Sequence, residues 1–263
     1  MTTDAADWQR WTEARHASVS APHGMLALIG THWLDTEPVE IAGVPGRWAV
    51  AADGAGVRVA AAVAEGLRAG AAEQPVAGEQ VLRPDTHPEA ETAHHGDRLL
   101  VPIERDGEFA LRVFDPAAEG RTHFAGIATY PYAPEWSVPA VFTPYEDGER
   151  TVTVPNADAR ERPLTVTGQI AFHLAGEPYT LTVTSADDRL SGVIADASSG
   201  QDTYRFRFVT LPGPDADGRT VLDLNRAYLP PCAFAEHFIC PFPPSGNRLP
   251  IAVRAGEKAV LRG

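Results

Sequence analysis

The sequence predicts a mostly β protein with two β-barrel- or sandwich-like subdomains, an amino-terminal helix and a Pro-rich carboxy-terminal cover. Three observations lead to this fold class. Apolar and polar residues alternate over many short runs, which is the pattern of half-buried strands. Clusters of Gly, Pro and Asp separate these runs and mark turns. Only the first segment of the chain keeps the spacing of an amphipathic helix.

This first segment is expected to form the helix. Trp8, Trp11 and Arg15 recur at helical spacing, and the two tryptophans share a face that we expect to pack on the body of the protein. Thr3 or Asp4 can cap the helix, because short polar side chains accept hydrogen bonds from the first turn.

Short strands and hairpins account for most of the remaining chain. Asp106-Gly107 between two alternating runs predicts a hairpin over residues 99–115, because this dipeptide favours the tight turns that join antiparallel strands. The other expected elements are a helical turn or strand at 25–34, a hairpin that joins 164–174 to 179–184 through 175–177, and strands at 39–41, 47–50, 57–59, 204–209, 220–224 and 251–254.

Two stretches interrupt the β pattern. Residues 65–91 are rich in Ala, Gly, Pro and Glu, and we expect them to form a long surface excursion. Residues 130–135 read YPYAPE, and β patterning resumes on both sides of them. We therefore divide the chain into residues 1–135, the helix plus one β subdomain, and residues 136–263, a second β subdomain.

Composition and charge exclude several function classes. A hydrophobic content of 44% supports a real core, and a net charge of -13 argues against a nucleic-acid partner, which needs a basic face. No uninterrupted run of about 18 apolar residues occurs, so no membrane partner is expected. The acidic amino terminus lacks the features of a secretory signal, and two cysteines are too few for a disulfide scaffold. We expect a cytoplasmic protein.

The polar residues that are the strongest candidates for a functional role lie between residues 220 and 250. Strand alternation places Asp223 and Asn225 on one face, which either lines a pocket or lies at a sheet edge, and composition favours the edge. Proline removes hydrogen-bond donors, so residues 230–244 can form neither a helix nor a central strand. They are expected to form a rigid cover, which could carry site residues or simply close a barrel.

The carboxy-terminal part of the chain carries four distinctive segments: DLNRAYLPPCAF (223–234), CPFPP (240–244), NRLP (247–250) and AGEK (255–258). Together they resemble an uncharacterised prokaryotic family, domain of unknown function 1684. The segments RHAS (15–18), 26–34 and FAG (124–126) are also similar to this family. DASSGQDTYR (196–205) resembles the family's Asp-x-Thr-x-Gly-x-x-Thr-Tyr element, although Ser198 replaces Thr and the sequence after Arg205 departs from the expected Gly/Arg-rich turn. The resemblance implies that the chain belongs to this family, and it assigns no established reaction to the chain.

The resemblance also implies a cluster of polar residues. Its arginines suit a carboxylate or phosphate, and its amides could orient a ligand. An internal network that holds the cover on the barrel is the equally weighted alternative. The implied members are Asp196, Tyr204, Arg205, Asp223, Asn225, Arg226, Tyr228, Asn247 and Arg248.

Our first hypothesis is that the protein binds a small polar or anionic organic molecule in a β-lined cleft, with Arg226 and Arg248 as anchors. Arg205, Asn225, Tyr228 and Asn247 complete this expected ligand-binding set. The alternatives are a hydrolase or isomerase that uses Asp223 as a base or Cys232 as a nucleophile, and a structural or partner-binding module. Cys232, His237 and Cys240 lack the ligand spacing of structural zinc sites, so we expect no metal and no cofactor. Oligomeric state is left open.

Overall fold

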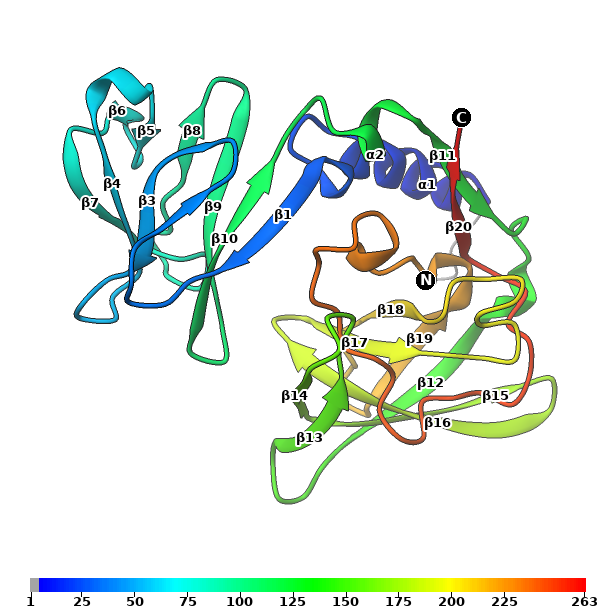
Figure 1. Ribbon diagram of the computed structural model, residues 1–263. Helices are drawn as coiled ribbons and strands as arrows, with labels where there is room; N and C mark the ends of the chain where they lie inside the picture. The colour runs from blue at the N-terminus through cyan, green and yellow to red at the C-terminus, as the bar shows by residue number, and fades with distance from the viewer. Residues whose placement is uncertain (1–4) are drawn as a thin grey trace. The chain divides into compact units, whose positions relative to one another are not determined.

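The chain is mostly β and has one long helix near its amino terminus, which confirms the predicted fold class (Figure 1). The computed structural model describes residues 5–263. The expected helix caps, Thr3 and Asp4, lie outside this range. Residues 18–123 form one compact unit, and residues 5–17 form a second unit together with 124–263. The seam near residue 135 stays a prediction. No helix in the described part of the chain has the length and apolar character needed to span a bilayer.

The 18–123 unit contains a six-stranded sheet, β1-β10-β9-β8-β5-β6, and a four-stranded sheet, β2-β3-β4-β7. Trp48 is fully buried, and Val57, Val59 and Leu111 pack in the same apolar core. The elements are η1 (Met25–Ala27), β1 (Leu28–Trp33), β2 (Val39–Ile41), β3 (Val44–Val50), β4 (Val57–Ala61), η2 (Val63–Glu65), β5 (Arg68–Ala69), β6 (Gln74–Pro75), β7 (Gly78–Leu82), β8 (Ala93–His95), β9 (Arg98–Arg105), β10 (Glu108–Phe114) and α2 (Glu119–Thr122).

Most sequence predictions in this unit are confirmed. β9 and β10 form the expected hairpin, and both turn residues adopt positive φ, 54° at Asp106 and 79° at Gly107. Residues 25–34 form a helical turn and then a strand, so both expected conformations occur. Most residues of the expected surface excursion at 65–91 are exposed, as predicted, but the stretch also contains the strands β5, β6 and β7. Leu67, Val76 and Leu82 pack in the core and anchor it, which its Ala- and Gly-rich composition concealed.

The second unit is built on a six-stranded antiparallel sheet, β18-β17-β16-β15-β12-β19. Its first and last strands come together, where the Thr220 hydroxyl donates to the Pro212 carbonyl at 2.8 Å, so the sheet is a nearly closed barrel. The elements are α1 (Ala5–Val19), β11 (Phe124–Thr129), η3 (Pro134–Trp136), β12 (Ser137–Pro144), β13 (Arg150–Pro155), β14 (Glu161–Val166), β15 (Gly168–Leu174), β16 (Glu177–Ala186), β17 (Arg189–Ile194), β18 (Arg207–Pro212), β19 (Arg219–Asp223), η4 (Leu224–Arg226), η5 (Pro231–Ala233) and β20 (Glu257–Arg262).

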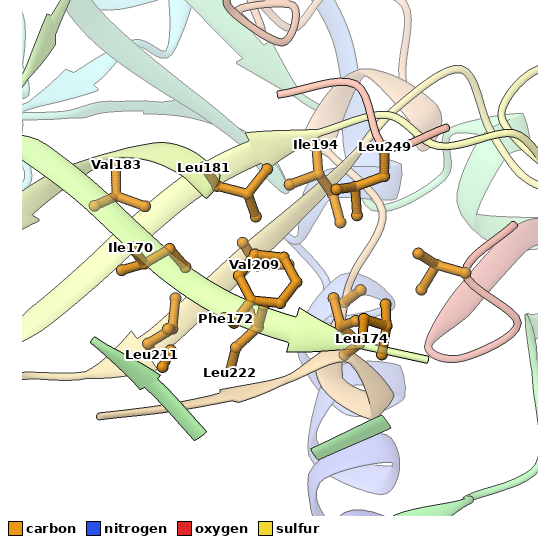
Figure 2. Packing of buried hydrophobic residues seen from close by; sticks show 14 of the residues in the cluster. Ile170, Phe172, Leu174, Leu181, Val183, Ile194, Val209, Leu211, Leu222 and Leu249 are labelled. Atoms are coloured by element: carbon orange, nitrogen blue, oxygen red, sulfur yellow. The ribbon is translucent and has the colours of Figure 1, made fainter. Parts of the chain in front are cut away.

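Alternation along the strands fills this barrel. Figure 2 shows Ile170 and Phe172 of β15 packed among Leu181, Val209 and other buried aliphatic side chains. Ala171, which lies between them in sequence, points to the opposite face of the sheet, because successive strand side chains alternate. The barrel interior is therefore packed with apolar side chains.

Three predictions in this unit need correction. The expected strand at 164–174 is two strands, β14 and β15, which break at Thr167 and pair with different neighbours. β18 begins at Arg207 rather than at residue 204. Residues 251–254 do not form a strand, because side chains satisfy the backbone of Val253: its amide donates to the Asp196 carboxylate and its carbonyl accepts from Arg207. The strand in this region is β20, which the sequence analysis missed.

Candidate functional site

Asp196, a member of the expected cluster, forms a buried ion pair with Arg207, which the sequence analysis did not assign. Both side chains have an exposed fraction of 0%, and a guanidinium nitrogen lies 2.7 Å from Asp196 Oδ2. The other carboxylate oxygen accepts from the Ser198 amide at 2.8 Å and from the Ser198 hydroxyl at 2.6 Å. Arg207 also donates to the carbonyls of Val253 and Ala255. These contacts hold the backbone at residues 253–255 against Arg207 of β18 and leave little of either charge for a ligand.

The two expected ligand-orienting asparagines serve the backbone instead. Asn225 is 1% exposed, and its side-chain amide exchanges two hydrogen bonds of 3.0 Å with the backbone of Ala133. Asn247 is fully buried; its amide exchanges two 2.8 Å hydrogen bonds with the backbone of Thr182 and donates to the Val193 carbonyl at 2.9 Å. A side-chain amide that pairs with the backbone N–H and C=O groups of another residue, as a neighbouring strand would, has a structural role.

The expected arginine anchors lie in different surroundings. Arg226 forms an ion pair with Asp7 of α1, and its Nε lies 3.6 Å from Asp223 Oδ2. Asp223 is 10% exposed and accepts hydrogen bonds from the amide and the side chain of Asn225. It ends β19, which is last in the hydrogen-bonded strand order but approaches β18 where the barrel closes. Asn225 lies beyond this strand in η4, so the expected strand face shared with Asp223 does not form. Arg248, by contrast, is exposed.

Helix α1 is held on this unit by contacts that the sequence analysis did not assign. Arg15 donates to both carboxylate oxygens of Glu257, at 2.8 and 3.0 Å, and Glu257 is 1% exposed. The Arg15 guanidinium also lies 5.0 Å from the ring centre of Tyr228. Trp8 donates from its indole nitrogen to the Asn225 carbonyl at 3.0 Å, which confirms that this face of the helix packs on the protein. The sequence feature that could have indicated this ion pair is Glu257, the single acidic residue of the AGEK segment.

A thiol cluster lies within the Pro-rich cover, where Cys232 and Cys240 approach each other. The Cys232 amide donates to Cys240 Sγ at 3.3 Å, and the Tyr204 hydroxyl lies 3.7 Å from Cys232 Sγ. Arg205 donates to the Tyr204 hydroxyl at 3.3 Å and stacks over the ring of Phe242, 5.0 Å from its centre. The structure therefore brings together Tyr204, Arg205 and Cys232 from the sequence-predicted residues.

The pKa values in this cluster are shifted. The hydrogen bond with the Cys240 side chain lowers the pKa of Cys232, the Tyr204 hydroxyl and the Arg205 charge act in the same direction, and burial opposes them. Burial raises the pKa of Tyr204, so its hydroxyl stays a proton donor. Among the described residues, no group of three or more His, Cys, Asp or Glu side chains is arranged to hold a metal ion.

A separate cavity of about 290 Å³ lies on the outer face of the barrel. Leu181 and Val183 point into the barrel core, so Thr182 and Thr184 between and beside them face this cavity from β16. The other walls are apolar and come from β14, β17, β18 and the cover. They comprise Leu164, Val166, Gly192, Val193, Phe208, Val209, Pro241 and Pro244.

The cavity contains a few hydroxyl groups and one residue from the predicted ligand-binding set. The Tyr228 hydroxyl lies 3.3 Å from Thr210 Oγ1, and its ring packs edge-to-face on Phe208. The Thr184 hydroxyl donates to the Thr165 carbonyl at 2.6 Å. Ser191 completes the polar lining. Arg205, Asn225, Arg226, Asn247 and Arg248 do not line this cavity, nor do Asp223 and Cys232.

Comparison with known proteins gives a family and no reaction. Residues 122–258 match the model of a family described as "Protein of unknown function (DUF1684)". The chain is similar to an uncharacterised protein from Haloarcula marismortui, solved by solution NMR, with 33% identity and a TM-score of 0.43 over 51% of this chain and 77% of that one. No curated protein matches the sequence. Because the matched segment spans more than half of the 263 residues and contains the barrel, the cover and the thiol cluster, the chain belongs to the DUF1684 family.

Proposed function

We propose that this protein binds a small, neutral organic molecule in the cavity on the outer face of β16, β17 and β18. The observation that carries this proposal is the chemistry of the cavity walls. Small-molecule sites are mostly apolar concavities with a few placed polar groups, and their volumes run from about 300 to 1,000 Å³. The cavity, at about 290 Å³, lies just below the lower limit of that range and suits a very small ligand.

The walls favour a particular class of ligand. Phe208, Leu164 and Pro241 offer apolar contact, while Tyr228 and Ser191 offer hydroxyl groups. No described residue that lines the cavity is charged, so a neutral molecule with one or two hydroxyl or carbonyl groups fits better than an anion. The expected polar character of the ligand is retained, and the anionic alternative has no support in this lining.

The surrounding network supports binding in a preformed site. Asn247 ties the backbone of Thr182 in β16 to that of Val193 in β17, and both of these residues line the cavity. Arg15 stacks on the ring of Tyr228, which forms part of the wall. Side chains that are held in this way lose little conformational entropy when a ligand binds, so a small contact area can give measurable affinity.

Ligand-observed NMR with a library of small neutral alcohols, amides and aromatic fragments tests the proposal. The Ser191→Phe variant fills the cavity from an exposed position on β17. The matched control is Ser185→Phe, which adds the same ring at an exposed site on β16 outside the cavity lining. We expect the wild type and Ser185→Phe to bind the same fragments, and Ser191→Phe to bind them at least about tenfold more weakly, a loss of about 1.4 kcal/mol.

The wild-type protein and its control decide the outcome. Binding that is unaffected by Ser191→Phe would place the ligand elsewhere and refute this site. The absence of any bound fragment in the wild type would favour the structural or partner-binding alternative. Turnover of a fragment that is lost in Asp223→Asn or Cys232→Ser would favour the enzyme alternative.

A further inference from the structure

The Cys232 and Cys240 thiols lie next to each other, although seven residues separate them in sequence. The amide of Cys232 donates to Cys240 Sγ at 3.3 Å, and the structure holds both residues as reduced thiols. The helical turn η5 and the prolines around it bend the cover back on itself, which brings the two residues together. The contact thus follows from a rigid part of the fold.

The two thiols differ in access and in electrostatic environment. Cys232 is 7% exposed, whereas Cys240 is 1% exposed, so a small reagent reaches Cys232 first. The Tyr204 hydroxyl donates to the Cys232 carbonyl at 3.2 Å and lies 3.7 Å from the Cys232 sulfur, and Arg205, which donates to that hydroxyl, adds a positive charge nearby. Both groups stabilise a thiolate. The lowered pKa of Cys232 is consistent with this arrangement.

We propose that Cys232 and Cys240 form a redox-active pair, in which a hydroperoxide oxidises Cys232 and Cys240 resolves the product to a disulfide. The Cys232 thiolate attacks the peroxide O–O bond, forms a sulfenic acid and releases an alkoxide, which takes up a proton and leaves as the alcohol (water when the oxidant is hydrogen peroxide). The Cys240 sulfur then attacks the sulfenic sulfur, an S–S bond forms, and hydroxide leaves as water with the Cys240 proton. Two thiols lose two electrons, and the peroxide gains them.

This inference is independent of the proposed ligand. Neither thiol lines the cavity, although Pro241, which follows Cys240 directly, does. Oxidation without fragment binding would therefore leave the redox pair standing, and fragment binding without oxidation would leave the cavity standing.

Intact-mass spectrometry of the full chain after treatment with hydrogen peroxide is the direct test. We expect the wild type to lose two hydrogen atoms and both alkylatable thiols, and to remain a single chain. Cys240→Ser is expected to stop at a sulfenic acid on Cys232, which a 1,3-dione reagent captures. Cys232→Ser is expected to leave Cys240 unmodified at the same peroxide dose, because that sulfur is more deeply buried.

Variants of Arg205 and Tyr204 test whether these two side chains make Cys232 more reactive by stabilising its thiolate. Arg205→Gln removes a positive charge that helps to lower the pKa of Cys232, so a smaller fraction of this thiol is ionised near neutral pH. The higher intrinsic nucleophilicity of a less acidic thiol offsets part of this loss, so oxidation should be a few-fold slower. Tyr204→Phe should slow it in the same direction. Arg254→Gln, which removes an exposed arginine elsewhere in the same unit, is the matched control and should not change the rate.

Three results would overturn the proposal. The first is a wild-type protein whose thiols resist peroxide while folded and react only after denaturation. The second is a product that consists only of intermolecular disulfides, and the third is equal oxidation of Cys240 in Cys232→Ser. Circular dichroism of each variant shows whether its fold is retained, and the wild-type mass alone decides the outcome if a variant fails to fold.

Discussion

Replacing Arg207 with methionine is expected to lower the free energy of unfolding of the 124–263 unit by about 3–5 kcal/mol, because it leaves a buried carboxylate without its counter-ion. The structure shows why the value should be large. Asp196 and Arg207 are each fully buried, and the guanidinium also donates to backbone carbonyls, including that of Val253 at 3.1 Å. Methionine matches the length of the arginine stem but supplies none of these donors.

The companion variant separates charge from packing. In Asp196→Asn/Arg207→Met both charges are gone, so the double variant should be more stable than Arg207→Met alone. A buried ion pair often contributes little beyond the cost of taking its two charges out of water, and the larger penalty arises when only one partner is removed. A double-mutant cycle therefore reports the coupling between the two side chains.

Urea unfolding followed by hydrogen exchange and mass spectrometry is the appropriate assay, because the two compact units need not unfold together. Peptides from 124–263 report the expected loss, and peptides from 18–123 provide an internal comparison. A loss below about 1 kcal/mol in Arg207→Met, or a double variant that is less stable than this single variant, would refute the reasoning.

Two further predictions follow from single side chains. Asn247→Ala should lower the free energy of unfolding of the barrel unit by about 2–4 kcal/mol, because it leaves buried backbone groups, including the amide and carbonyl of Thr182, without a hydrogen-bond partner. Hydrogen exchange at the Thr182 amide should also become faster. Exchange at the wild-type rate would contradict this prediction. In the other unit, the Ala117 amide and the Arg98 guanidinium lower the pKa of Asp115 against the effect of burial. The ionised Asp115 should therefore stabilise this unit at pH values above the ordinary carboxyl pKa, and this stabilisation should disappear as the pH falls through the lowered pKa. Asp115→Asn should make the free energy of unfolding of this unit depend less steeply on pH at acid pH. An unchanged pH dependence would contradict this prediction.

The local elements were predictable where short-range geometry decides them. The Asp106-Gly107 turn requires positive φ at both residues, and few other dipeptides accept that cheaply. The face that carries Trp8 was predictable because helical spacing depends on adjacent turns alone. The prediction of a strand at 251–254 was wrong because the backbone groups of Val253 form hydrogen bonds with the side chains of Asp196 and Arg207, which are distant in sequence.

The site was predictable only in part, for the same physical reason. The sequence indicated that Asn225, Asn247 and Arg226 matter, but their residue types suit a ligand and a backbone partner equally well. The structure shows the two amides bonded to backbone and Arg226 paired with Asp7. The cavity walls at Thr182 and Ser191 carried no signal, since hydroxyl residues on the outer face of a strand are ordinary surface.

The sequence by itself determined the mostly β class, the amino-terminal helix, the main hairpins and the family, because these depend on periodicity, turn chemistry and contiguous motifs. Only the tertiary structure decided which polar residues are buried in pairs, that Cys232 meets Cys240, and that a cavity opens outside the barrel. Those outcomes depend on distances between residues far apart in the chain. Barrel closure and the bend of the Pro-rich cover set these distances, and no local pattern encodes them.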